Sequence, residues 1–228
     1  LSRGLGDVYK RQENTFFRGL KKLLPGRYLI WQDGKLEIHR YWKPEFHPDE
    51  SKTLEDWADE IHNTLKEIMP EVKTADEKVE SFLSGGVDSS YVLAMSDAEQ
   101  ADSCGYEEER FDESVLAEKT AQLLGRKFSR SIITPEQFFD IVPYVMYNME
   151  QPLGDASAIV FTIACNATAE HTKICYSGEG ADEFFGGYNM YRNAERYGEN
   201  LKTFYVGNTN IMKEDEKKKI LKHYNPEV

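Results

Sequence analysis

The feature that most restricts the fold is the regular alternation of strand-like and helix-like segments from residue 78 onward. Consecutive strands joined through helices favour a parallel sheet, with helices packed on both of its faces. The sequence therefore predicts an α/β domain. The expected strands cover residues 78–83, 101–105, 127–133 and 172–177, and the expected helices cover residues 88–95, 112–124, 135–149 and 156–171.

A different pattern precedes this domain. The β-rich runs GRYLIW and KLEIHRYW flank Asp33-Gly34, a pair that is a strong signal for a hairpin turn. A polar linker with prolines follows, and from Thr53 to Pro70 the apolar residues fall at helical spacing. We expect residues 1–12 to be a non-native or artefactual segment, because they carry no apolar period.

Composition limits the classes of partner. The formal net charge of −12 suits a nucleic-acid partner poorly, because proteins that grip phosphate backbones carry a basic face. Cys104, Cys165 and Cys175 have no metal-ligand spacing and are expected to be free thiols in a reducing compartment. No apolar run approaches the roughly 18 residues of a membrane span. We therefore expect no nucleic acid, no membrane and, by elimination, a cytoplasmic setting.

The motif SGGVDSS, residues 84–90, lies where a strand ends and a helix begins. Ligands of parallel sheets bind at the carboxyl ends of the strands. Two glycines let the backbone approach an anion, and amides of the first helical turn can point at phosphate oxygens. Asp88 would repel a phosphate unless a cation lay between them, and Mg²⁺ accepts both carboxylate and phosphate oxygens. The plainer alternative is that Asp88 caps the helix in an ordinary glycine turn.

A second cluster of the same kind is SGEGADE, residues 177–183, followed by FFGGY. It also comes directly after an expected strand and combines small residues with acidic ones. Asp182 could supply a second metal ligand, whereas Glu183 alone is also explained as a solvated turn charge. Two such loops in one parallel sheet favour a magnesium–polyphosphate site.

The two motifs together resemble a known family. SGGVDSS is similar to the pyrophosphate-loop (PP-loop) signature of the N-type ATP pyrophosphatases. Together with SGEGADEFFGGY it resembles the synthetase domain of glutamine-dependent asparagine synthetases. EQPLGDASAI supports this resemblance, and NTFFRGLKKLLPGRYL is similar to the end of the family's glutaminase domain. The resemblance implies that residues 13–48 are a hairpin and linker from that domain, and that residues 49–228 are a C-terminally truncated ATP-dependent synthetase domain.

The resemblance also implies the site residues, with ATP and Mg²⁺ as cofactors. Asp88 and Asp182 would hold Mg²⁺ and act as catalytic residues together with Glu179, which would recognise aspartate or accept a proton from ammonia. The residues expected to contact the nucleotide are Phe82, Leu83, Ser84, Gly85, Gly86, Val87, Asp88, Ser89, Ser90, Cys104, Ser177 and Gly178.

The implied reaction is adenylation of the side-chain carboxylate of aspartate, release of pyrophosphate, and amidation by ammonia to give asparagine. In the full-length protein the ammonia would come from glutamine. The family's cysteine nucleophile is not seen here, so we expect this chain to use free ammonia. Members of this family often associate as dimers, so the resemblance implies a homodimer. Two alternatives stay open: a related amidotransferase with another carboxylate acceptor, and an inactive ATP-binding fragment.

Overall fold

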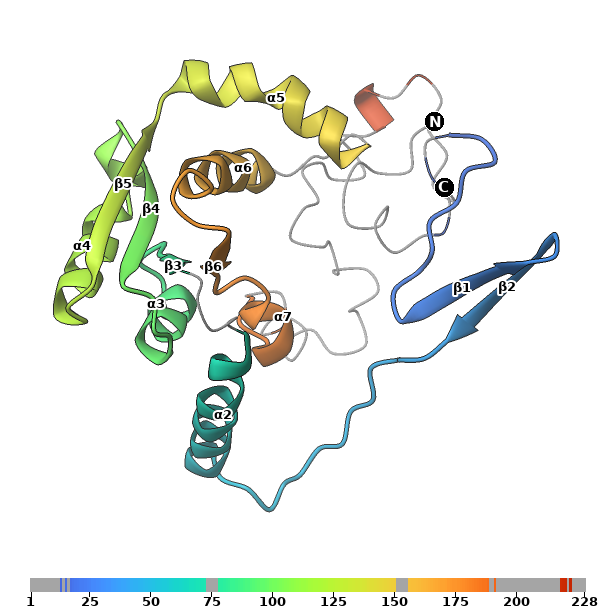
Figure 1. Ribbon diagram of the computed structural model, residues 1–228, viewed down its shortest axis with the longest axis horizontal. Coiled ribbons are helices and arrows are strands. Elements are labelled where there is room, and N and C mark those ends of the chain that lie inside the picture. The colour runs from blue at the N-terminus through green and yellow to red at the C-terminus, as the bar shows by residue number, and fades with distance from the viewer. Residues whose placement is uncertain are drawn as a thin grey trace. The chain divides into compact units, whose positions relative to one another are not determined.

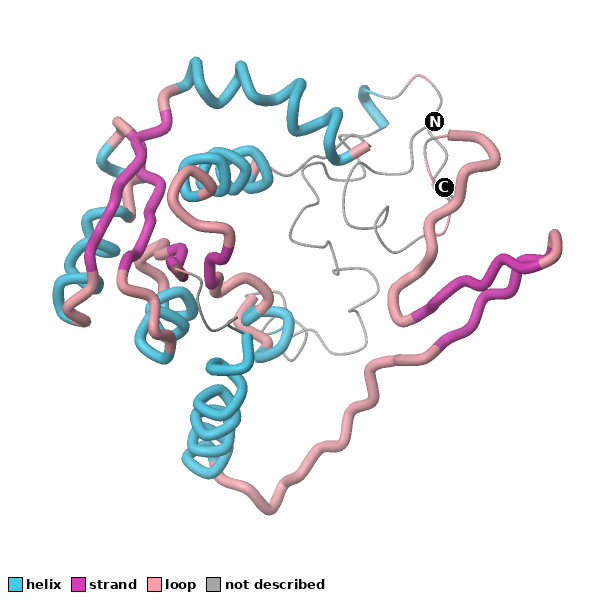
Figure 2. Tube along the Cα trace, viewed as in Figure 1, coloured by secondary structure: helices cyan, strands magenta, loops and turns pink. Residues whose placement is uncertain are grey.

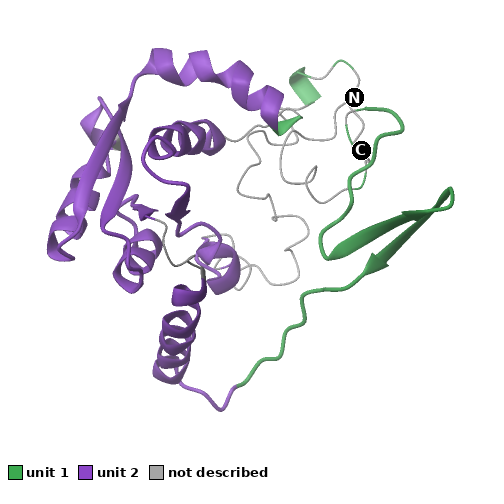
Figure 3. Cartoon of the chain, in the orientation of Figure 1, with its two compact units in different colours: residues 1–49, 149–155, 192–228 green, residues 50–148, 156–191 purple. Residues whose placement is uncertain are grey.

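The computed structural model describes residues 13, 15, 17–72, 78–150, 156–188, 191, 218–220 and 222. The chain separates into two compact units, which Figure 3 shows in different colours. The first comprises Leu1–Asp49, Met149–Asp155 and Arg192–Val228, and the second comprises Glu50–Asn148 and Ala156–Tyr191. The segment 1–12, expected to be artefactual, lies outside the described residues.

The first unit contains the predicted β-hairpin. Strands β1 (Arg27–Gln32) and β2 (Lys35–Arg40) pair antiparallel, and Gln32 opposite Lys35 closes the turn. Both turn residues are left-handed, with φ of 51° at Asp33 and 74° at Gly34. Two left-handed residues match the right-handed twist of the strands, which is why Asp-Gly is favoured there. The hairpin prediction is confirmed.

The second unit is built on the predicted parallel sheet. Its strands are β3 (Val79–Phe82), β4 (Gln100–Tyr106), β5 (Lys127–Ile133) and β6 (Ile174–Tyr176), in the order β5-β4-β3-β6 (Figure 2). Every neighbouring pair is parallel. The α/β prediction is confirmed, and β4 extends one residue beyond each end of the expected strand.

Helices cover both faces of this sheet. The four that connect the strands are α3 (Val87–Met95), α4 (Ser114–Leu123), α5 (Pro135–Met149) and α6 (Ser157–Thr168). Helices α4 and α6 lie on opposite sides of β4 and β5 (Figure 1). Helix α5 runs through Pro143 as one helix. Two 3₁₀ turns, η1 (Met69–Val72) and η2 (Glu109–Phe111), and the short helix α7 (Ala181–Phe185) complete the described elements.

Helix α2 (Leu54–Ile68) precedes the sheet and begins where the sequence predicts. The Thr53 hydroxyl accepts a hydrogen bond from the Asp56 amide, and the Asp56 carboxylate accepts one from the Thr53 amide. This reciprocal pair satisfies two amides that the helix itself cannot. The helix ends just before Pro70, which lies within η1.

The hydrophobic core is built largely from small side chains. Leu83 and Leu93 are almost fully buried and pack with Ala101 of β4 and with Ala117 and Ala121 of α4. Alanines at these positions let the helix approach the sheet closely. The remaining members of the core cluster are Val79, Ala98 and Tyr176.

The strand order creates a switch point beside β3. The chain leaves β3 toward β4 and β5, and then returns through α5 and α6 to place β6 on the other side of β3. The carboxyl ends of β3 and β6 are therefore neighbours, although the connection after β3 leads away from β6 to β4. Open parallel sheets bind ligands at this kind of crevice. Both small-residue motifs follow these two strands.

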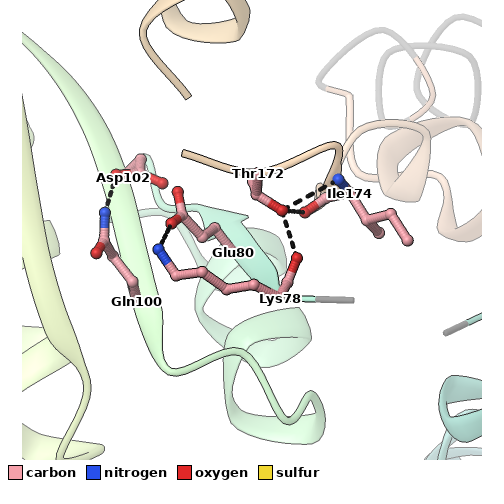
Figure 4. A network of polar contacts seen from close by, with 6 residues as sticks. All are labelled: Lys78, Glu80, Gln100, Asp102, Thr172 and Ile174. Carbon is pink, nitrogen blue, oxygen red and sulfur yellow. Dashed lines mark hydrogen bonds and ion pairs between the residues drawn. The ribbon is translucent and has the colours of Figure 1, made fainter. Parts of the chain in front are cut away.

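A pair of carboxyl groups lies within the sheet, away from the motifs. Glu80 is fully buried and bonds to Lys78, while Asp102 accepts a hydrogen bond of 2.9 Å from Gln100. In Figure 4 the side chains of Glu80 and Asp102 point toward one another. Burial raises the pKa of Asp102 to about 6; Glu80 adds to the rise, whereas Gln100 and His171 oppose it. Folding thus favours the protonated form of Asp102.

The raised pKa gives an expected pH dependence. Protonation of Asp102 stabilises the fold below its unfolded pKa near 4, and this contribution is lost as the pH rises through about 6. Asp102→Asn keeps the shape and can donate to Glu80, so at about pH 8 it should raise the free energy of unfolding by about 1–2 kcal/mol, discounted for partial exposure. Near pH 4 the two proteins should be equally stable.

Urea unfolding across this pH range, in a choline buffer, measures the difference. Asp140→Asn, which removes an exposed carboxylate from α5, is the control and should follow the wild type at every pH. Parallel stability curves for wild type and Asp102→Asn would contradict the expectation.

Candidate nucleotide-binding site

The first loop, residues 84–86, is closed by its own hydroxyl groups. The Ser89 hydroxyl accepts a hydrogen bond from the Ser84 amide at 3.1 Å, lies 3.0 Å from the Ser84 hydroxyl, and donates to the carbonyl of Gly86 at 3.3 Å. The Ser90 hydroxyl donates to the same carbonyl at 2.7 Å. Ser89 is buried, so it holds the loop from inside, whereas Ser84 is exposed and its hydroxyl also accepts a hydrogen bond from the Gly86 amide at 3.3 Å.

The loop also packs against helix α4. Gly85 has a φ of +87°, and a Cβ placed there would lie 3.0 Å from the Glu113 carbonyl oxygen and 3.2 Å from the Ala117 amide nitrogen. Both the backbone angle and the close contact require glycine. The loop is thereby fixed between the end of β3 and the start of α4.

Helix α3 begins directly after this loop, with Gly86 as its N-cap. Asp88 is therefore the second residue of the helix, and the alternative that it caps the helix is wrong. Asp88 is exposed, as is Val87, and within the described residues its carboxylate makes no hydrogen bond or ion pair. The first-turn amides of a helix lack partners inside it. The start of α3 thus offers amides and an uncommitted carboxylate together.

The second loop, residues 177–180, meets the first one. A Cβ on Gly178 would lie 2.7 Å from the Ser89 amide nitrogen and 2.9 Å from the Asp88 carbonyl carbon. Gly178 is thus pressed against the first turn of α3. The Ser177 hydroxyl accepts a hydrogen bond of 3.1 Å from the Glu179 amide, which turns the chain toward α7. Two motifs far apart in sequence form one surface.

The acidic residues of the second motif, one in the loop and two in α7, lie around Tyr188. The Tyr188 hydroxyl donates to the Glu183 carboxylate at 2.7 Å. That hydrogen bond raises the pKa of Tyr188, with further contributions from burial and from the charges of Glu183, Asp182 and Glu179. The Asp182 carboxylate lies over Gly187, where any Cβ would collide with it. Tyr188 was not among the predicted site residues, although the run GGY that ends the motif contains it.

Phe82, Leu83 and Cys104, which the family resemblance implies lie beside the nucleoside, offer different groups to a ligand. The ring of Phe82 is partly buried and meets that of Phe161 edge-on at a centroid distance of 5.3 Å. The side chain of Leu83 is buried in the core, so only its backbone could face a ligand. Cys104 is partly exposed on β4, and burial raises the pKa of its thiol to about 11. All three cysteines are free thiols.

Within the described part of the chain, no group of three or more His, Cys, Asp and Glu side chains is arranged to hold a metal ion. The chain could contribute two carboxylates, from Asp88 and Asp182, and a metal ion bound there would take its remaining ligands from phosphate oxygens and water. Oxygen ligands of this kind suit Mg²⁺, which keeps several waters and binds through one or two carboxylates. The donor set therefore fits magnesium.

These features define an α/β domain of the PP-loop class, with small-residue loops after two adjacent parallel strands. The chain belongs to the asparagine synthase family, whose model matches residues 60–226. The family predicted from the two motifs is confirmed.

Individual relatives agree with this family. The chain is 30% identical to asparagine synthetase (glutamine-hydrolysing) 1 of Bacillus subtilis strain 168, over 95% of this chain and 40% of the relative. It is also 30% identical to amidase chry2 of Gibberella zeae, over 81% of this chain and 31% of that protein. The chain thus spans well under half the length of these relatives.

Among solved structures, the chain resembles the glutamine-dependent NAD⁺ synthetase from Acinetobacter baumannii, with a TM-score of 0.42 and 20% identity over 68% of this chain and 32% of that one. In the part of the chain that the structure describes, no helix has the length and apolar character needed to cross a membrane.

Proposed function

We propose that this chain is the ATP-dependent part of an amide ligase. It would bind MgATP where the two loops meet, transfer AMP to the side-chain carboxylate of aspartate, and release pyrophosphate. Ammonia would then displace AMP to form asparagine. The observation that carries the proposal is the contact of Gly178 with Asp88 and Ser89, because it joins both motifs into one surface at the switch point.

The chain's own groups suit the binding of a triphosphate. The amides at the start of α3 and the exposed Ser84 hydroxyl would donate to pyrophosphate oxygens, and the helix dipole adds positive potential. Ser177 and Gly178 would lie beside the α-phosphate. Donors that are fixed before the reaction stabilise the negative charge that develops during adenylation. Bound Mg²⁺ would neutralise phosphate charge and polarise the phosphorus–oxygen bond.

Glu179 is proposed to serve the second half of the reaction. Attack by ammonia requires a proton acceptor within hydrogen-bond reach. Glu179 is exposed on the second loop, two residues after Ser177, and its carboxylate is not committed to a partner within the described residues. The same carboxylate could instead bind the amino group of the acceptor. Either role places its effect after the binding of ATP.

The direct test is the exchange of radiolabelled pyrophosphate into ATP by the full-length protein, with aspartate and Mg²⁺. We expect exchange that depends on both aspartate and Mg²⁺, without any need for ammonia, because adenylation precedes amidation. Glu179→Gln should retain ATP binding and lose formation of asparagine. Tight binding of MgATP without exchange for any acceptor would favour an inactive nucleotide-binding module instead.

A second candidate function keeps the chemistry and changes the acceptor. It is favoured by the similarity to amidase chry2, which is as high in identity as that to the bacterial asparagine synthetase. The same exchange assay, run with a panel of carboxylic acids, separates the two functions. Exchange with another acid that exceeds exchange with aspartate would replace the proposed substrate and leave the proposed adenylation intact.

A further inference from the structure

A polar cavity of about 210 Å³ lies between helix α6 and strands β4 and β5. Asp102 and Ser129 line it from the sheet, where they are register neighbours, and Thr168, Glu170 and His171 line it from α6 and the turn that follows. A contact between a helix and a sheet is ordinarily apolar. A cavity with this lining needs its own explanation.

The cavity lies over the middle of β4 and β5 and under the C-terminal half of α6. Helix α6 leads into β6, so the C-terminal end of α6 lies near the beginning of β6. Thr172, which follows α6, donates to the carbonyl of Lys78 just before β3, and accepts from the Ile174 amide at 3.2 Å (Figure 4). The two loops follow the other ends of β3 and β6. On the side of the sheet the cavity reaches Cys104, which is expected to contact the nucleotide, and Thr168, Glu170 and His171 line its other part.

Buried oxygen atoms at this cavity lack partners. The Thr168 side chain lines the cavity and is only 4% exposed, yet its hydroxyl has no hydrogen-bond partner. One carboxylate oxygen of Asp102, which also lines the cavity, is buried and has none either. One oxygen of Glu80, whose side chain points toward Asp102, is also unpartnered unless a proton on Asp102 joins the two carboxyl groups (Figure 4). Buried polar atoms are nearly always bonded, so once Asp102 has lost its proton these oxygens require another donor or a cation.

The charged side chains around the cavity indicate that the missing partner is a cation and not a neutral donor. Asp102 and Glu170 both line it, and among the described residues no lysine or arginine does. Lys78 is already bonded to Glu80, which leaves His171 as the one basic side chain in the lining. Glu170 is exposed to solvent, so the buried charge is that of Asp102 beside Glu80, and burying negative charge is costly unless a positive charge compensates it. A cation compensates the charge and also satisfies the unpaired oxygens.

We propose that this cavity binds a partly hydrated monovalent cation of the size of K⁺ or ammonium, with Asp102 and Thr168 as its protein ligands. The described residues offer no cluster of three acidic, histidine or cysteine side chains of the kind that holds a divalent metal. A weakly held cation can instead take its remaining ligands from hydroxyl groups and from water, for which the volume leaves room. The proposal is independent of the function proposed for the nucleotide-binding loops.

The test is thermal unfolding of the chain at one ionic strength, near pH 8, with potassium, ammonium or choline as the only cation. A ligand that binds only the folded state raises the melting temperature by mass action. We expect potassium or ammonium to raise it by about 2–4 °C above choline, whose methyl groups keep its charge away from the carboxylate and hydroxyl oxygens. A rise with both ions indicates recognition by size and charge, and a rise with ammonium alone indicates recognition of its N–H donors.

Matched variants assign the effect to the cavity. Asp102→Asn and Thr168→Val should abolish the rise, whereas Thr168→Ser keeps the hydroxyl and Asp140→Asn lies elsewhere, so both should retain it. Thr168→Ser also serves if the valine variant does not fold. Equal melting temperatures in all three salts, or a rise that persists in both Asp102→Asn and Thr168→Val, would overturn the proposal. So would loss of the rise on adding MgATP, because the cavity would then belong to the nucleotide-binding site.

Discussion

Replacement of Asp88 by asparagine is expected to lower ATP–pyrophosphate exchange by about 100- to 1000-fold, the range seen when one preorganised electrostatic group is removed. Asparagine keeps the shape of the side chain and removes the charge that would hold Mg²⁺. The fold should not change, because Asp88 is exposed on α3 and its carboxylate has no partner within the described residues. Asp182→Asn should have a comparable effect on exchange.

Exchange rates of the full-length protein, measured over a range of Mg²⁺ concentrations, check this expectation. The residual activity of either variant should require more Mg²⁺ than the wild type does, which separates loss of a metal ligand from general damage. Asp59→Asn removes an exposed charge from α2 and is the control, with exchange at the wild-type level. If Asp88→Asn and Asp182→Asn both exchange normally, the two carboxylates have no role with the metal.

The sheet could be predicted from the sequence because alternation of strands and helices leaves few arrangements. Parallel strands need crossover helices, and those helices must cover both faces. The placement of both motifs at one edge follows from the same rule, since each motif comes directly after a strand. The rule does not give the order of the strands. Only the return of α5 and α6 across the sheet makes β3 and β6 neighbours.

The details that fix the site come from packing between distant segments, which one sequence does not display. The contacts of Gly85 with α4 and of Gly178 with α3 join residues widely separated in the chain. The strand around residues 101–105 is short and polar in sequence, yet β4 lies between β3 and β5. Asp102 lies on the polar face of β4. Its carboxylate is tolerated there because it accepts a hydrogen bond from Gln100 and borders a polar cavity. Tertiary context overrides local propensity at such positions.

Gly178→Ala is expected to weaken the binding of MgATP by about 10- to 100-fold, as overpacking by one methyl group costs about 1–3 kcal/mol. The added Cβ would lie 2.7 Å from the Ser89 amide nitrogen and 2.9 Å from the Asp88 carbonyl carbon. Both neighbours are backbone atoms at the start of a helix and cannot rotate away. The second loop must therefore move off α3, which separates the two halves of the proposed phosphate site.

Calorimetric titration of MgATP into the chain and its variants measures this effect, and Gly125→Ala is the matched control. Gly125 has a φ of +66° and open space around its Cβ position, so alanine there adds backbone strain of about 1 kcal/mol without a new contact. The control should lose stability and keep its affinity for MgATP, whereas Gly178→Ala should lose affinity even where it is fully folded. Both variants add one methyl group at a glycine, but only Gly178→Ala creates a new close contact. Equal affinities of the two variants for MgATP would therefore mean that the contact between the two loops does not shape the nucleotide site.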